Sequence, residues 1–156
     1  MDARITDGKR KFDYRVAGIL IHNDKVLLHK RRENGAWAPV GGGCEIMEKS
    51  SNAAKREFEE ETGIKVNIKK LLWVVEDFFN YDDLKIHQVA MYYLLELKGE
   101  SKYTEVEEFK GIEVGKNLKF KWFDIASIET ADIKPAFLKT YLNNINDNIK
   151  HLVIEE

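Results

Sequence analysis

Three glutamates, Glu57, Glu60 and Glu61, lie within one short segment of the chain. If the segment is helical, their i, i+3 and i+4 spacing places them on one face, whereas Glu59 points away from them. Carboxylates crowded in this way repel one another, and each like-charged pair destabilises a helix by about 0.2–0.5 kcal/mol. A hard divalent cation would turn that repulsion into binding, because Mg²⁺ prefers oxygen ligands and often binds a substrate phosphate as well. The segment is therefore a candidate metal site, although an isolated acidic run of this kind is most often a solvated surface.

The residues around these acids predict the helix that must hold them. Ser50 or Ser51 can cap its first turn, and Gly63 stands where a helix ends. Ala54 and Phe58 are four residues apart and would form the apolar face that packs against the rest of the protein. The three acids would share the neighbouring face of this helix.

A longer pattern surrounds the acids and favours the metal site over a plain surface. Between Gly42 and Ile64 the sequence matches, without a gap, the pattern G-x5-E-x7-R-E-U-x-E-E-x-G-U, where U is a bulky apolar residue. The specified positions are occupied by Gly42, Glu48, Arg56, Glu57, Phe58, Glu60, Glu61, Gly63 and Ile64. This segment resembles the Nudix box, the signature of the Nudix hydrolases. The family uses divalent metal to hydrolyse a nucleoside diphosphate that is linked to another group.

The resemblance implies a set of metal ligands. In the family these are box glutamates together with a backbone carbonyl of the glycine turn, which correspond here to Glu57, Glu60, Glu61 and the Gly41 carbonyl. The expected cofactor is Mg²⁺, with Mn²⁺ as an alternative. The stretch before the box reads Pro39-Val40-Gly41-Gly42, whereas family members commonly have Leu-Pro-Gly-Gly. The proline therefore stands one position earlier than is usual for the family.

A glutamate near the metal acts as general base in this family, and members differ in which one. We expect Glu60 to be the base, with Glu113 or Glu108 of the polar segment 98–115 as the alternatives. Ordinary surface charge is the more frequent role of loop acids such as these two. Arg56 can reach Glu60 one turn later on the helix and orient it, so we expect Glu60 and Arg56 to be the catalytic pair.

Two residues outside the box are candidates for substrate binding. Arg31 ends a predicted strand close to the glycine turn, and similar arginines in the family contact phosphate, which arginine can bind with two parallel hydrogen bonds. Tyr81 stands where dinucleoside polyphosphate hydrolases of the family often carry a tyrosine. Aromatic residues could also provide a platform on which a base stacks, although most aromatics in strands belong to the core. Those considered are Phe78, Phe79, Tyr81, Tyr92 and Tyr93.

Composition limits the class of protein. The chain has 156 residues, of which 44% are hydrophobic, and this predicts a single domain over residues 1–156. Its net charge is −2 without a basic block, so we expect a nucleotide-type small-molecule substrate and no general binding of DNA. The only cysteine, Cys44, excludes an internal disulfide and fits a cytoplasmic location. Apolar runs such as residues 16–21 are too short to cross a membrane. The oligomeric state is open, with a homodimer as one option.

The order of predicted elements suggests how the box is positioned. Strands are expected at residues 15–22, 25–31, 37–40, 64–79, 85–97 and 118–122, with turns at Asn23-Asp24 and at residues 80–83. The box helix lies between the third and fourth of these strands, and Pro135 can begin a C-terminal helix. A mixed sheet between helices is the sensible packing for this α/β order. It agrees with the α/β/α sandwich that the Nudix resemblance implies.

The leading functional hypothesis is a Mg²⁺-dependent hydrolase that cleaves the pyrophosphate linkage of a nucleoside diphosphate derivative. Nucleoside triphosphates, dinucleoside polyphosphates and nucleotide sugars are all candidate substrates. One alternative is a non-catalytic, nucleotide-sensing Nudix-like domain. Another is a pyrophosphohydrolase that acts on the 5′ end of RNA, although the absence of a marked basic surface argues against it.

Overall fold

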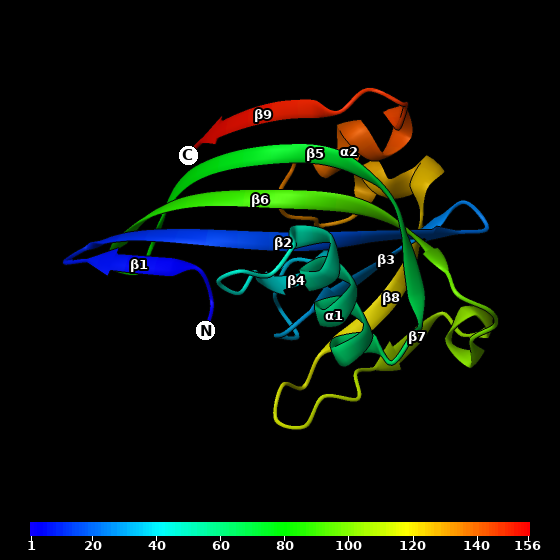
Figure 1. Ribbon diagram of the computed structural model, residues 1–156. Coiled ribbons are helices and arrows are strands. Elements are labelled where there is room, and N and C mark those ends of the chain that lie inside the picture. Colours follow the sequence, from blue (N-terminus) through cyan, green and yellow to red (C-terminus); the bar gives the residue numbers. More distant parts are fainter.

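The computed structural model describes residues 1–156 and contains a mixed sheet of nine strands (Figure 1). The strands are β1 (Arg4–Asp7), β2 (Arg10–His22), β3 (Lys25–Lys30), β4 (Ala38–Gly43), β5 (Val66–Tyr81), β6 (Leu84–Leu97), β7 (Glu108–Lys110), β8 (Lys119–Asp124) and β9 (Lys150–Glu155). Their order in the sheet is β7-β8-β3-β4-β2-β6-β5-β9, and β1 pairs with β2 outside this path. Strand β2 is parallel to β6 and β5 is parallel to β9, while the other pairs are antiparallel.

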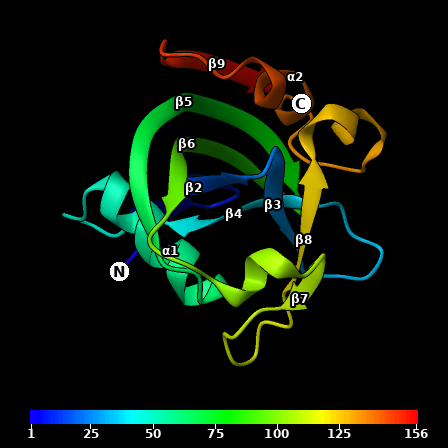
Figure 2. The same ribbon diagram turned by 90° about the vertical axis from the view of Figure 1, so that its right-hand side faces the viewer.

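Helices cover both faces of the sheet. Helix α1 (Ser50–Thr62) lies on one face, and the short helices η2 (Ile125–Thr130), α2 (Leu138–Tyr141) and η3 (Leu142–Asn144) lie on the other (Figures 1 and 2). Neighbouring residues of β2 therefore serve different cores. Ile19 belongs to the cluster on the α2 side, and Leu20 belongs to the cluster that includes Phe58 of α1. A sheet buried on both faces needs such continuous apolar runs. The predicted α/β/α sandwich is confirmed.

Helix α1 ends where the sequence predicts, but it begins differently. Gly63 adopts a left-handed conformation with φ 75°, and its N–H donates to the Glu59 carbonyl. The predicted cap by Ser50 or Ser51 is wrong, because Lys49 is the N-cap residue and no side chain caps the helix. The hydroxyl of Ser50 instead makes a 2.6 Å hydrogen bond with the hydroxyl of Tyr93. This tertiary contact removes the serine from the capping position.

The glycine run lies inside β4 rather than after it. In the register of the β2–β4 pair, Gly41 is opposite Ala17 and Gly42 is opposite Val16. A Cβ atom at Gly41 would lie 2.1 Å from the carbonyl oxygen of Val16, so only glycine fits this close approach of two strands. Helix α1 packs directly on β2 and β4. The glycines therefore let the acidic helix lie against the sheet.

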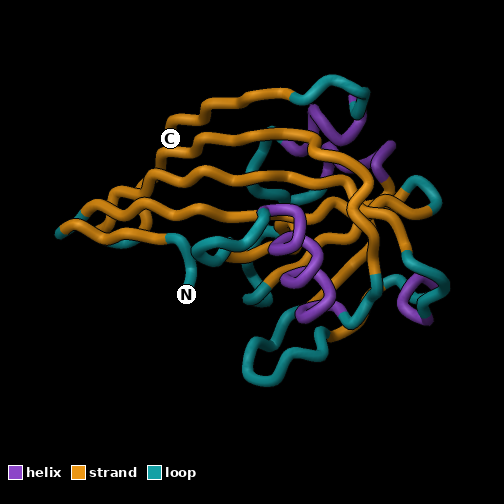
Figure 3. The backbone as a smooth tube through the Cα atoms, in the orientation of Figure 1, coloured by secondary structure: helices purple, strands orange, loops and turns teal.

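Strands β1, β2, β5 and β6 extend beyond the part of the sheet that α1 covers (Figure 3). Tyr81 lies at the tip of the β5–β6 hairpin, opposite Leu84, and is 59% exposed. In β6 the next residue, Lys85, is level with Arg10 at the start of β2. Tyr81 is thus several residues along the strands from the glycine run.

The ends of the chain differ most from the sequence analysis. Strands β1 and β9 lie where no strand is predicted, and the polar segment contains both β7 and the short helix η1 (Lys102–Glu105). The predicted C-terminal helix is one turn of α2 followed by η3. Side-chain amides of Asn143 and Asn144 donate to backbone carbonyls of Lys139 and Thr140, and asparagine competes with helical hydrogen bonds in this way. No helix is long and apolar enough to cross a membrane.

Candidate active site

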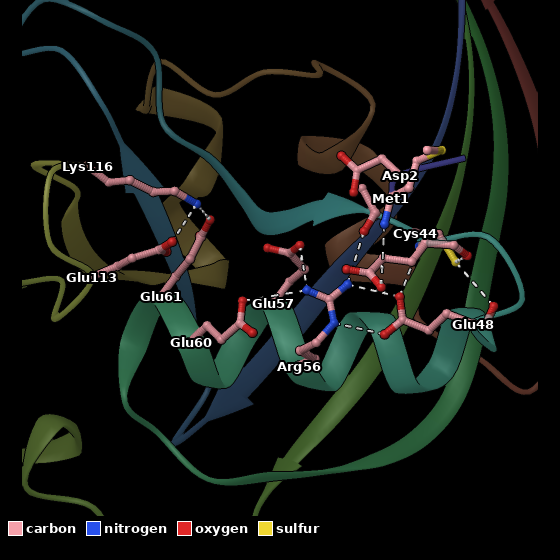
Figure 4. Close-up of polar contacts among 12 residues, drawn as sticks. Met1, Asp2, Cys44, Glu48, Arg56, Glu57, Glu60, Glu61, Glu113 and Lys116 are labelled. Atoms are coloured by element: carbon pink, nitrogen blue, oxygen red, sulfur yellow. Dashed lines mark hydrogen bonds and ion pairs between the residues drawn. The ribbon is translucent and has the colours of Figure 1, made fainter. Parts of the chain in front are cut away.

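The contacts of Glu59 separate it from Glu57, Glu60 and Glu61 of helix α1, the three acids that Figure 4 shows. Glu59 accepts a hydrogen bond from the backbone N–H of Val66 at 3.1 Å and pairs with Lys65 at 3.3 Å. The other three acids have different partners: Glu57 and Glu60 lie near Arg56, and Glu61 lies near Lys116. Their environments differ greatly, because only Glu60 is well exposed, with 51% of its side-chain surface accessible.

Arg56 makes its strongest contacts with Glu48 and Glu57. Its Nε and Nη2 atoms donate to the two carboxylate oxygens of Glu48 at 2.8 and 2.9 Å, and Nη1 donates to Glu57 at 3.0 Å. Nη2 also donates to the Gly43 carbonyl at 3.3 Å. The predicted partner, Glu60, lies within ion-pair distance at 3.6 Å. Hydrogen bonds from Arg56 are the main reason that the pKa of Glu48 lies below its usual value.

Glu57 lies between Arg56 and the glycine run. A Cβ atom at Gly42 would be 2.3 Å from the carboxylate carbon of Glu57, so the missing side chain makes room for this acid. Burial raises the pKa of Glu57, although the hydrogen bond from Arg56 opposes that shift. The carboxylate is therefore held close to the backbone of β4 in a partly desolvated position.

Glu61 is the most unusual group in the site. It is only 1% exposed, and neither carboxylate oxygen has a hydrogen-bond partner. The Lys116 ammonium lies 3.5 Å away, and the same ammonium pairs with Glu113 at 3.0 Å. Burial raises the pKa of Glu61 to about 7. Buried carboxylates are normally hydrogen-bonded or bound to a metal, and Glu61 has no hydrogen bond.

The acids suit a hard divalent cation, although their side chains do not converge on one point. No three His, Cys, Asp or Glu side chains are close enough together to share an ion. Glu57 is drawn toward Arg56, and Glu61 is drawn toward Lys116 (Figure 4). The donors are nevertheless all oxygens, and the two Glu61 oxygens are buried without partners. This donor set fits such an ion, because hard cations prefer oxygen ligands and Glu61 has two oxygens without partners.

A basic cavity of about 190 Å³ lies beside the glycine run. Arg15, Arg31 and Lys134 contribute positive charge to its wall, and no acidic residue lines it. Gly41, whose carbonyl is one of the expected metal ligands, also lines this cavity. Burial, reinforced by the charges of Arg31 and Arg15, lowers the pKa of His29 in the same wall to about 4. His29 is therefore neutral at pH 7, and the three cations make the cavity suitable for phosphate groups.

A model of the NUDIX domain matches residues 13–142 of the chain. The chain belongs to the Nudix hydrolase family. Over 137 residues it is 30% identical to the nucleoside triphosphatase NudI of Enterobacter sp., and the match covers 81% of this chain and 92% of that protein. Over 87 residues it is 34% identical to the ADP-ribose pyrophosphatase of Methanocaldococcus jannaschii, and the match covers 54% of this chain and 50% of that protein.

A solved structure agrees with the Nudix assignment. The crystal structure of a NUDIX hydrolase from Nitrosomonas europaea has a TM-score of 0.68 and 25% identity, and the match covers 92% of this chain and 79% of that one. The chain spans half or less of the length of the first curated relatives that it matches.

The structure brings some of the predicted Nudix site residues together and leaves others apart. Arg31 and Gly41 both line the basic cavity. Glu113 and Glu61 both pair with the ammonium of Lys116. Glu108 instead pairs with Lys119 and Lys121 on β8. Tyr81 lies at the exposed hairpin tip.

The aromatic residues considered for base stacking do not all lie in one place. Tyr92 packs on Trp73 and Phe137 in the core, and Tyr93 hydrogen-bonds to Ser50 near α1, so these neighbours serve different parts of the fold. Phe78 stacks on His87, with ring centroids 4.4 Å apart, in the extended part of the sheet. Sequence reasoning missed three cations that the fold places around the site, namely Arg15, Lys116 and Lys134. None of them belongs to a motif.

Proposed function

We propose that residues 1–156 act as one Nudix domain that hydrolyses a pyrophosphate linkage in a nucleoside diphosphate derivative with the help of a divalent cation. The buried Glu61, whose two oxygens have no hydrogen-bond partner, carries this proposal. Burying an ionised carboxylate without adequate partners is strongly unfavourable. A cation held by Glu61 and its neighbours on α1 would offset that cost. The buried carboxylate, which destabilises the metal-free protein, would then be retained for its role in binding the cation.

The residues of α1 have separable roles in this proposal. Glu57, Glu60, Glu61 and the Gly41 carbonyl would hold Mg²⁺ or Mn²⁺, which would neutralise and align the phosphates of the substrate. Arg56 positions Glu57 and joins it to Glu48, so that the ligand-bearing helix and the turn before it move as one. Removing such supporting contacts typically weakens metal binding or activity by about 10–100-fold.

Glu60 is the proposed general base. Its carboxylate is the most exposed of the three and makes no hydrogen bond, so it is free to take a proton from an attacking water. Glu113 is the alternative, because it lies next to Lys116 and has one buried oxygen without a partner. Glu108 is less suitable, because its carboxylate pairs with two lysines of β8.

The basic cavity guides the choice of substrate. Arg15, Arg31 and Lys134 can bind several negative charges next to Gly41, which favours a substrate with at least two linked phosphates. The names of the two relatives suggest a nucleoside triphosphate or ADP-ribose, and we propose these classes ahead of dinucleoside polyphosphates. Dinucleoside polyphosphates rank lower because the sequence argument for them depends on Tyr81. This residue lies at the exposed tip of the β5–β6 hairpin, away from the glycine run.

A substrate panel tests the proposal. Nucleoside triphosphates, ADP-ribose, other nucleotide sugars, dinucleoside polyphosphates and triphosphorylated RNA are incubated with Mg²⁺, with Mn²⁺ or with EDTA. We expect release of a nucleoside monophosphate only in the presence of metal. Faster phosphate release from p-nitrophenyl phosphate than from every diphosphate would contradict the proposal, since a monoester cannot fill a site that aligns two phosphates. Nucleotide binding without turnover under both metals would favour a sensor instead.

A further inference from the structure

The loop between β7 and β8, residues 111–118, lies over the C-terminal end of α1. Its two ends are joined by a hydrogen bond from the Gly111 N–H to the Leu118 carbonyl at 2.9 Å. The N–H of Ile112 donates to the backbone carbonyl of Glu61 at 3.4 Å, which attaches the loop to the last turn of α1. These contacts bring the side chain of Lys116 to the carboxylate of Glu61 (Figure 4).

Lys116 is the only cation that the structure places within ion-pair distance of Glu61. Its ammonium lies 3.5 Å from Glu61 and 3.0 Å from Glu113, and so connects the helix to the loop. The two acids retain oxygens without any hydrogen-bond partner. The Lys116 ammonium therefore offsets the negative charge of the buried Glu61 carboxylate, which no hydrogen bond stabilises.

The position of Lys116 also affects the other acids. Arg56 holds Glu57 from the side of the glycine run, while Lys116 holds Glu61 from the side of the loop. Each carboxylate is turned toward its own cation, and no three acids are near enough to share an ion. A divalent cation and the ammonium cannot both occupy the space beside Glu61, because like charges repel strongly at such distances in a partly buried site.

We propose that Lys116 is a positioning residue for the metal site: its ammonium serves as the counter-ion of Glu61 in the metal-depleted protein, and a divalent cation displaces it together with the 111–118 loop. This inference rests on the proposed function, since it assumes that Glu61 is a metal ligand. It goes further by coupling metal binding to the conformation of a loop outside the Nudix box. Displacement would free Lys116 and break the hydrogen bond between the Ile112 N–H and the Glu61 carbonyl.

Metal affinity provides the first test. Mg²⁺ is titrated calorimetrically at pH 8.5, where competition from protons at the carboxylates is small, into wild type, Lys116→Met and Lys116→Arg. Because the cation no longer has to displace an ammonium, Lys116→Met should bind Mg²⁺ on the order of tenfold more tightly. Lys116→Arg retains the charge and should restore affinity close to that of wild type. A purely structural lysine predicts weaker binding in Lys116→Met, since Glu61 would be misplaced.

Lys119 offers a matched control. It has a similar side-chain exposure, 37% against 35% for Lys116, but pairs with Glu33 and Glu108 rather than with Glu61. Lys119→Met should therefore leave Mg²⁺ affinity unchanged. An equal gain in affinity for Lys119→Met and Lys116→Met would mean that net charge alone is responsible, and this would overturn the specific role of Lys116.

Hydrogen exchange of the loop provides the second test. In wild type, addition of Mg²⁺ should speed exchange of the hydrogen-bonded loop amides of Gly111, Ile112 and Lys116, while in Lys116→Met these amides should exchange fast both with and without Mg²⁺. Slower exchange of these amides in wild type on Mg²⁺ binding would overturn the inference. A wild type that binds no Mg²⁺ would contradict the proposed function and the inference together. A wild type that binds Mg²⁺, with Lys116→Met unchanged in affinity, would overturn the inference alone.

Discussion

Arg56 donates two hydrogen bonds to the carboxylate of Glu48, from Nε to Oε1 at 2.8 Å and from Nη2 to Oε2 at 2.9 Å. Glu48 lies before the first turn of α1, and its carboxylate also accepts the backbone N–H of Glu45 at 3.0 Å. The pair therefore joins the turn that follows the glycine run to the helix that carries the acids. A forked contact of this kind uses the planar geometry of arginine and a carboxylate.

Arg56→Ala should weaken Mg²⁺ binding and hydrolysis by roughly 10–100-fold without unfolding the protein. Loss of the side chain releases Glu48 and Glu57 together. Arg56→Lys should rescue only part of this loss, because one ammonium cannot make the forked pair. Mg²⁺ titration and circular dichroism of both variants check the prediction. Lys55→Ala, on the same helix but facing Glu59, is the control; intact metal affinity in Arg56→Ala would contradict the role given to Arg56.

The partners of Arg56 show what sequence spacing can and cannot predict. Positions four apart on one helix are neighbours by geometry, so the contact with Glu60 could be anticipated. The stronger contact with Glu48 depends on how the preceding turn folds back, which spacing does not reveal. The same limit applies to Lys116, which is distant in sequence from Glu61 and reaches it only because β7 and β8 return the chain to α1.

The fold was predictable where burial leaves a regular pattern. Strands β2 and β3 are apolar on both faces, and α1 has an apolar face that ends at Gly63. Strand β1 carries no strand pattern, because its four residues, all exposed, include only one large apolar side chain, Ile5. Strand β9 alternates between partly buried and exposed residues, which is the period of a strand. It is fixed mainly by parallel pairing with β5, a long-range contact that local sequence does not specify.

Glu60→Gln should reduce turnover by about 10²-fold or more, because it removes both a proposed ligand charge and the proposed base. The variant should fold normally, since Glu60 is half exposed and makes no hydrogen bond. Steady-state kinetics on the best substrate of the panel measure the effect. Glu113→Gln is the informative comparison. A larger loss in Glu113→Gln than in Glu60→Gln would transfer the role of base to the loop acid.

Two neighbouring glycines should respond differently to alanine. A Cβ atom at Gly41 would meet the backbone oxygen of Val16 at 2.1 Å, so Gly41→Ala should lower the thermal midpoint sharply. At Gly42 the Cβ atom would meet only the carboxylate of Glu57, which can move aside. Gly42→Ala should therefore remain folded and lose metal affinity and activity. Thermal denaturation combined with Mg²⁺ titration distinguishes the two effects, and equal destabilisation of both variants would contradict this reading of the site.

Glu61→Gln should make the metal-depleted protein more stable at neutral and alkaline pH. Burial raises the pKa of Glu61 to about 7 in the folded protein, from an ordinary value of 4.5, so the folded state binds this proton more strongly than the unfolded chain. The stability that protonation provides is present in full below about pH 4.5 and is lost as the pH rises to about 7. Above pH 7 the buried charge should cost roughly 3 kcal/mol, and glutamine avoids that cost.

Urea denaturation in EDTA at pH 5, 6.5 and 8 measures this difference. The advantage of Glu61→Gln over wild type should be below about 1 kcal/mol at pH 5 and should grow to about 1–3 kcal/mol at pH 8, the lower value allowing for an unpaired buried amide. His29, whose pKa burial lowers to about 4, weakens both proteins equally in acid and cancels in the comparison. Added Mg²⁺ should stabilise wild type more than Glu61→Gln, because the variant lacks one of the proposed carboxylate ligands. A Glu61→Gln protein that is less stable than wild type at pH 8 in EDTA would show that Lys116 already compensates the buried charge.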